Sequence, residues 1–149
     1  MTERKLPLPT IYAPLEELNH KFDAALQKVK SGLGTEYGML INGKDVMALE
    51  KYEDYSPINT DWMLAIMQNG DEKHAQLAIE SARKAFQSWS HTPWQERIGI
   101  LRKAAGLVEE RLFELSAAMS LEVGKNRMAA LGDVQETAGL ISTYCDLME

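Results

Sequence analysis

Hydrophobic residues recur every three or four positions over long stretches of the chain, which is the spacing of a helix with one buried face. The first stretch begins at Pro14, which suits a first helical turn, and ends at Gly32 and Gly34. The second follows Asp71, whose side chain can cap a helix. Because the hydrophobic positions of this second helix are mostly alanines, we expect it to pack closely against another helix or a sheet. These positions are Ala75, Ala78, Ile79, Ala82, Ala85, Phe86 and Trp89.

Two further helices are predicted in the second half of the chain. The sequence Thr92-Pro93-Trp94-Gln95 combines a hydroxyl cap, a first-turn proline and a glutamine, which is typical of a helix start. The pattern then continues to Val123, with a candidate break near Arg111. Gly124 can take the left-handed conformation that ends a helix, and Asn126 can cap the next one. The fourth helix has its hydrophobic positions at Met128, Leu131, Val134, Ala138, Ile141, Tyr144 and Met148.

The segment between the first two helices contains two predicted pairs of short strands. Asn42-Gly43 tolerates the positive φ angles of a tight hairpin, and Pro57 and Asn59 interrupt the second pair. The strands are expected at residues 39–41, 46–49, 52–56 and 62–67. We therefore predict a mostly helical α+β chain with about four long helices and two short antiparallel strand pairs, without a doubly wound parallel sheet. Residues 1–13 are predicted to form an extended arm, since two prolines lie in their first ten positions.

Composition indicates a folded globular chain without affinity for polyanions. Of 149 residues, 45% are hydrophobic and 26% are charged, and the net charge is -6 without a basic stripe. We therefore expect no nucleic-acid partner and no membrane partner. A hydrophobic run long enough for a signal sequence or a membrane span is missing from the sequence, so we expect a cytoplasmic protein.

The residues alone do not give a complete catalytic set. Gly124-Lys125 resembles the end of a phosphate-binding loop, but Met119 and Asn126 occupy places that such a loop gives to glycine and to serine or threonine. The three histidines are too scattered for a local zinc motif. Cys145 is a candidate nucleophile, but Asp146 beside it disfavours a thiolate, and a small residue on the buried side of a helix is the alternative.

Asp133 and Glu136 are three residues apart and therefore share one helix face. That geometry is compatible with acid-base chemistry. A solvated acidic face is the alternative.

Four segments in this order resemble the amino-terminal part of the aldehyde dehydrogenase superfamily. They read INGKDV, SPIN, AFQSW and TPWQERIGILRKAAGLVEERLFELSAAMSLEVGK, and the resemblance runs from about Tyr37 to the end. Within the superfamily, LEVGKNR followed by GDVQET is most similar to the 1-pyrroline-5-carboxylate dehydrogenases, also called L-glutamate γ-semialdehyde dehydrogenases. The stretch FDAALQKVKSGLGTEYGMLING extends this similarity back to Phe22.

The resemblance implies an α/β parent in which a Rossmann-like cofactor-binding domain is followed by a catalytic domain and an oligomerisation arm. Residues 14–149 would then be the incomplete amino-terminal part of the cofactor-binding domain. The parent would use NAD or NADP, oxidise L-glutamate γ-semialdehyde to glutamate in proline catabolism, and form a homo-oligomer. Because the family's catalytic and dinucleotide-binding residues would lie beyond Glu149, we expect no catalytic residue, no bound cofactor and no activity in this chain alone.

The resemblance also implies roles for three acids. Glu136, with Asp133 one turn earlier, would face the tunnel through which the aldehyde enters, while Glu122 matches a place where many members hold a monovalent metal ion. For Glu122 the alternative is a charge in a last helical turn, and for Glu136 it is an exposed acid without a role. The chain would thus supply scaffold and tunnel wall to an enzyme. A free-standing helical module that binds a partner through its apolar surface, or a fragment without a function of its own, are the other hypotheses.

Overall fold

The structure is a computed structural model that describes residues 14–149, which form two compact units. Residues 14–31 and 94–149 make up the first, called here the helical unit. Residues 32–93 make up the second, called the strand unit. The extended arm predicted for residues 1–13 lies outside the described residues.

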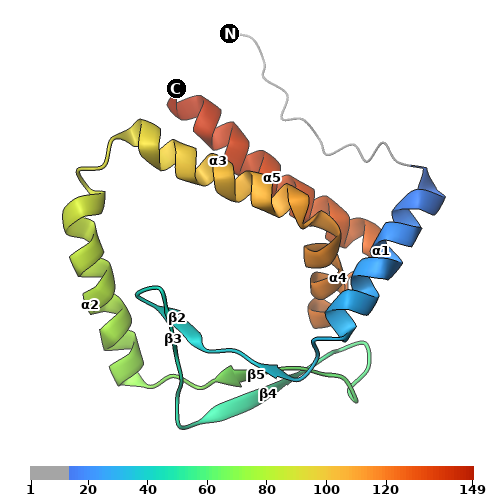
Figure 1. Cartoon of the computed structure of the whole chain (residues 1–149). Coiled ribbons are helices and arrows are strands. Elements are labelled where there is room, and N and C mark those ends of the chain that lie inside the picture. Colours follow the sequence, from blue (N-terminus) through green and yellow to red (C-terminus); the bar gives the residue numbers. More distant parts are fainter. Residues whose placement is uncertain (1–13) are drawn as a thin grey trace. The chain divides into compact units, whose positions relative to one another are not determined.

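The helical unit contains four helices, of which α3 lies along α5 while α1 and α5 pack against α4 (Figure 1). Their bounds are α1 Leu15–Lys30, α3 Trp94–Glu110, α4 Leu112–Val123 and α5 Arg127–Met148. The long third helix of the sequence prediction is two helices, because Arg111 leaves the helical conformation with φ -99° and ψ 17°. The break expected at this residue is confirmed.

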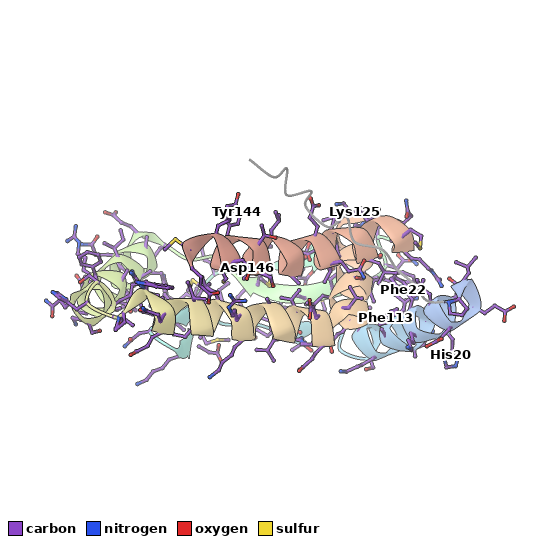
Figure 2. All side chains as sticks on the ribbon, turned by 90° about the horizontal axis from the view of Figure 1, so that it is seen from above. His20, Phe22, Phe113, Lys125, Tyr144 and Asp146 are labelled. Atoms are coloured by element: carbon purple, nitrogen blue, oxygen red, sulfur yellow. The ribbon has the colours of Figure 1, made fainter. Side chains whose placement is uncertain are left out.

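The core of the helical unit lies where α1, α4 and α5 meet. Leu18 and Phe22 from α1, Ala117 from α4 and Leu131 from α5 form one buried cluster. Phe113 of α4 packs against it beside Phe22 (Figure 2). Ala117 and Leu131 are 0% exposed, so this is a dry contact in which an alanine lets the helices approach closely.

Polar contacts at the rim fix α1 against the other helices. The Arg127 guanidinium donates to Asn19 Oδ1 at 2.7 Å and to Asp23 Oδ1 at 2.8 Å, and it lies 4.7 Å from the centre of the Phe22 ring. At the other end of α1, Glu114 accepts from Lys28 at 2.8 Å and from Arg111 at 2.6 Å. Hydrogen bonds from these two cations lower the pKa of Glu114 to about 2.

The turn between α4 and α5 follows the sequence prediction. Gly124 has φ 72°, a left-handed conformation that costs glycine little, and its N–H donates to the Ser120 carbonyl at 3.1 Å. Asn126 Oδ1 accepts from the Ala129 N–H at 3.0 Å and so caps α5. The chain therefore passes from α4 to α5 in three residues, between two helix ends that are both capped.

The strand unit contains two small sheets and one helix. Its strands are β1 Thr35–Glu36, β2 Met39–Ile41, β3 Lys44–Val46, β4 Lys51–Tyr55 and β5 Met63–Gln68. One sheet has the order β1-β5-β4, with β1 parallel and β4 antiparallel to β5. The other is the antiparallel hairpin β2-β3.

Both predicted antiparallel pairs are confirmed, with one strand displaced and one strand added. Asn42 and Gly43 have φ 53° and 71°, so Ile41 pairs directly with Lys44. Therefore β3 begins at Lys44, ahead of the predicted residues 46–49. The two-residue strand β1 was not predicted because it is too short for a pattern and depends on pairing with β5.

A buried side chain links the two sheets of the strand unit. Gln68 Oε1 accepts from the Ala48 N–H at 2.8 Å, while Gln68 Nε2 donates to Glu36 Oε1 and to the Tyr37 carbonyl, both at 3.0 Å. Since a buried amide must find partners, these bonds hold the end of β5 against the chain on either side of the hairpin.

Helix α2, Glu72–Trp89, begins as predicted but packs differently. Asp71 caps it by accepting from the Lys73 and His74 N–H groups. No residue of α2 is buried, so the prediction that its alanine-rich face packs closely is wrong for the described part of the chain. Across the described residues, none of the helices has the length and apolar character needed to cross a membrane.

Candidate functional site

The sequence-predicted acids lie on the α4-α5 turn and on the first half of α5. Glu122 is in the last turn of α4, and Asp133 and Glu136 are on the second and third turns of α5. The Gly124 turn and the Asn126 cap fix the backbone between them. Local sequence signals therefore determine the backbone positions from which all three carboxylates project.

Asp133 forms an ion pair with a lysine from the turn between α4 and α5. Its side chain is 41% exposed and forms a short ion pair with Lys125 Nζ. The Thr137 hydroxyl donates to its backbone carbonyl at 2.8 Å. Lys125 lies at the amino-terminal end of α5 (Figure 2), where the helix dipole disfavours a cation, so the pairing with Asp133 offsets that cost.

Glu136 has no such partner. It is exposed, whereas Val134 and Ala138 on either side of it are buried. Because Glu136 lies two residues from Val134 and from Ala138, helix geometry predicts that it points away from their buried stripe, and its exposure confirms this prediction. Within the described residues it makes neither a hydrogen bond nor an ion pair. Its carboxylate is available to accept hydrogen bonds from a cationic group.

Glu122 is exposed at the end of α4. Among residues 14–149, no three His, Cys, Asp or Glu side chains group closely enough to hold a metal ion. Within that range, carboxylate side chains therefore do not complete a metal site around Glu122, and the cation role of this residue stays a prediction.

Cys145 is a packing residue. It is 1% exposed on α5, which confirms the interpretation of a small residue on the buried side of a helix. Tyr144, predicted to be buried, is 66% exposed and points away from α3 (Figure 2). The error is one residue, because Cys145 lies two turns after the buried Ala138 and continues its stripe.

Sequence reasoning missed the two basic residues that organise this region. Lys125 was considered in the comparison with a phosphate-binding loop, but its partner is Asp133, eight positions later. Arg127 reaches α1, more than a hundred positions away, to contact Asn19 and Asp23. Neither spacing is a local helix signal, because helical neighbours are three or four residues apart.

A family model decides what kind of protein this is. The model of the aldehyde dehydrogenase family matches residues 45–149, which include the strands β4 and β5 and helices α2 to α5. The chain belongs to the aldehyde dehydrogenase family. This confirms the predicted family.

Relatives within the family are 1-pyrroline-5-carboxylate dehydrogenases. One from Halalkalibacterium halodurans is 35% identical over 133 residues, which are 89% of this chain and 26% of the relative. One from Bacillus subtilis is 32% identical over 127 residues, which are 85% of this chain and 25% of the relative. The chain spans about a quarter of the length of these curated relatives.

A solved structure extends the similarity to the fold. The 1-pyrroline-5-carboxylate dehydrogenase from Thermus, crystallised with bound NAD, matches with a TM-score of 0.87 and 31% identity. The match covers 98% of this aldehyde dehydrogenase chain and 28% of the Thermus chain. The mostly helical α+β segment of an aldehyde dehydrogenase fold is thus the observed architecture.

Proposed function

We propose that this chain is the amino-terminal segment of an NAD(P)-dependent aldehyde dehydrogenase that oxidises L-glutamate γ-semialdehyde to glutamate in proline catabolism. The match with the Thermus enzyme carries this proposal, because it covers nearly all of this chain and about a quarter of that enzyme. Residues 14–149 form the first part of the cofactor-binding domain. The segment supplies scaffold and tunnel wall, while the nucleophile that attacks the aldehyde belongs to the rest of the enzyme.

The cofactor is bound by residues outside this chain. Within residues 14–149, the one place where a strand leads directly into a helix is Asn69-Gly70-Asp71, between β5 and α2. There the Lys73 and His74 N–H groups already donate to Asp71 Oδ1, at 3.0 and 3.1 Å. A carboxylate of the chain thus occupies the position at which a helix would receive a pyrophosphate. The described residues therefore do not fit a dinucleotide.

Glu136 is the residue of this segment that faces the substrate. Support comes from its exposure, its lack of a partner in the described residues, and its position opposite the buried stripe of α5. L-Glutamate γ-semialdehyde carries an ammonium group, and a carboxylate accepts charge-assisted hydrogen bonds from such a group. The aldehyde substrate and the remaining domains are the partners of this segment in a cytoplasmic homo-oligomer.

A free-standing helical module is the second candidate. It is favoured by α2, on which Ile79, Phe86 and Trp89 are 48%, 65% and 45% exposed. A partner protein could cover that face. The remaining domains of an enzyme would cover it equally well, and a fragment without function of its own would leave it open.

One experiment separates these candidates. The protein is isolated from its natural source, its mass is measured, and NAD reduction is followed with L-glutamate γ-semialdehyde. We expect a polypeptide about three and a half times as long as this chain, because 133 matched residues are 26% of the relative, and turnover of the aldehyde. The 149-residue chain alone is expected to show no turnover. A natural protein of 149 residues that does not oxidise the aldehyde would overturn the enzyme proposal.

A further inference from the structure

We propose that Lys125 is a positioning residue for substrate recognition: it neutralises Asp133 and leaves Glu136 as the carboxylate on this face of α5 that receives the substrate ammonium group. The inference rests on the proposed function and adds a residue to it. It is carried by the Lys125-Asp133 ion pair, which places a cation on one of two neighbouring acids and not on the other.

The two acids are close enough to compete for one cation. Residues three apart on a helix differ by about 60° around the axis and about 4.5 Å along it. Asp133 and Glu136 therefore project from one face as neighbours. Two unpaired carboxylates there would offer an ammonium group two positions, which differ by nearly one helical turn.

The backbone around Lys125 is held at both ends. Gly124 ends α4 with a hydrogen bond to Ser120, and Asn126 caps α5. The lysine therefore starts from a fixed point and extends along α5 to Asp133. Arg127, the next cation, is engaged with Asn19 and Asp23, so it does not substitute for Lys125.

Pairing selects one position for the substrate. An aldehyde whose ammonium group binds at Glu136 has its reacting carbon at one distance along the tunnel. Binding at Asp133 would shift that carbon by about 4.5 Å, which is enough to abolish attack. Lys125 thus suppresses a non-productive complex rather than stabilising the productive one.

This makes a distinctive kinetic prediction for the intact enzyme. In Lys125→Met, non-productive binding lowers both kcat and KM for L-glutamate γ-semialdehyde by about two- to fivefold, in line with an exposed ion pair, and leaves kcat/KM unchanged. Propionaldehyde has no ammonium group, so its kcat and KM stay constant. Lys103→Met, which removes an exposed lysine on α3, is the matched control and changes kcat and KM for neither aldehyde.

Asp133 variants test whether Lys125 acts through this residue. Lys125→Met combined with Asp133→Asn removes both partners and restores wild-type kinetics, as does the conservative Lys125→Arg. Asp133→Asn alone frees the lysine to pair with Glu136, so KM for the amino-acid aldehyde rises while kcat stays constant. The two single variants therefore shift KM in opposite directions, and the double variant leaves KM at its wild-type value.

The outcomes distinguish the inference from the function on which it rests. Equal losses with both aldehydes in Lys125→Met, or failure of the double variant to restore kcat, would overturn the positioning role and leave a structural turn residue. If Lys125→Met does not fold, Asp133→Asn tests the positioning role instead: a rise in KM for the amino-acid aldehyde supports this role, and an unchanged KM overturns it. Two results would instead overturn the proposed function and the inference with it. One is a wild-type enzyme that does not oxidise L-glutamate γ-semialdehyde. The other is a Glu136→Gln variant in which kcat/KM changes by the same factor for both aldehydes.

Discussion

Helices α2 and α5 both have amphipathic sequences, but they differ in how much of the apolar face is buried. Helix α5 buries five side chains, whereas α2 buries none. Yet the alternation of apolar and polar residues is clear in α2, whose apolar face includes Ile79, Phe86 and Trp89. Periodicity shows that a face requires burial, but it does not show that the covering surface belongs to the same stretch of chain.

The largest effect expected from this difference comes from truncating one side chain on each helix. Leu131 is 0% exposed on α5, and Leu131→Ala should lower the free energy of unfolding by about 2–5 kcal/mol. Ile79 is 48% exposed on α2, and Ile79→Ala should cost less than about 1 kcal/mol. Urea unfolding of the chain measures both. Equal losses would show that α2 is buried in solution.

A second contrast concerns arginines. Arg127→Ala on α5 removes the hydrogen bonds to Asn19 and Asp23 and the contact with the Phe22 ring, so we expect a loss of about 1–3 kcal/mol. Arg83 is an exposed arginine on α2, and Arg83→Ala should change stability by no more than about 0.5 kcal/mol. The same denaturation experiment applies. An Arg127→Ala variant as stable as the wild type would mean that the hydrophobic contacts and the Lys28-Glu114 ion pair hold α1 without Arg127.

Sequence reasoning succeeded where structure is determined locally. The Asp71 and Asn126 caps, the Gly124 turn and the Asn42-Gly43 hairpin depend on a few adjacent residues, and all four are present. Strand β1 depends on a partner thirty positions away, so its two residues carried no pattern. Tyr144 was predicted to be buried but is exposed, because the tertiary contacts of α5 cover its neighbour Cys145, and these contacts cannot be read from spacing alone.

In the candidate site, too, only the locally determined features could be predicted from the sequence. Helix geometry alone placed Glu136 on the exposed face of α5, as observed. The pairing of Asp133 with Lys125 could not be predicted, because it crosses two helical turns from an irregular segment. What Glu136 and Glu122 bind depends on parts of the enzyme outside this chain, and these roles stay predictions.

Acid should affect the helical unit through Glu114, whose pKa is held at about 2 by Lys28 and Arg111. The unfolded carboxyl has a pKa near 4.5, so the unfolded state binds more protons between these values. The stabilisation is therefore complete above about pH 4.5 and is lost as the pH falls to about 2. Glu114→Gln should make the urea midpoint less dependent on pH in this range. An unchanged dependence in the variant would exclude Glu114 as the source.

The smallest effect on global stability is expected from the cap of α2, and it tests the comparison most closely. Asn126→Ala removes the hydrogen bond to the Ala129 N–H, and because α5 is part of the core it should lower the unfolding free energy by about 1 kcal/mol. Asp71→Ala removes bonds to two N–H groups, Lys73 and His74, yet α2 can fray without exposing any buried side chain. We therefore expect Asp71→Ala to leave the urea midpoint unchanged while amide hydrogen exchange in the first turns of α2 accelerates several-fold. A shifted midpoint in Asp71→Ala would show that α2 unfolds together with the remainder of the chain, and the contrast between the two helices would then be wrong.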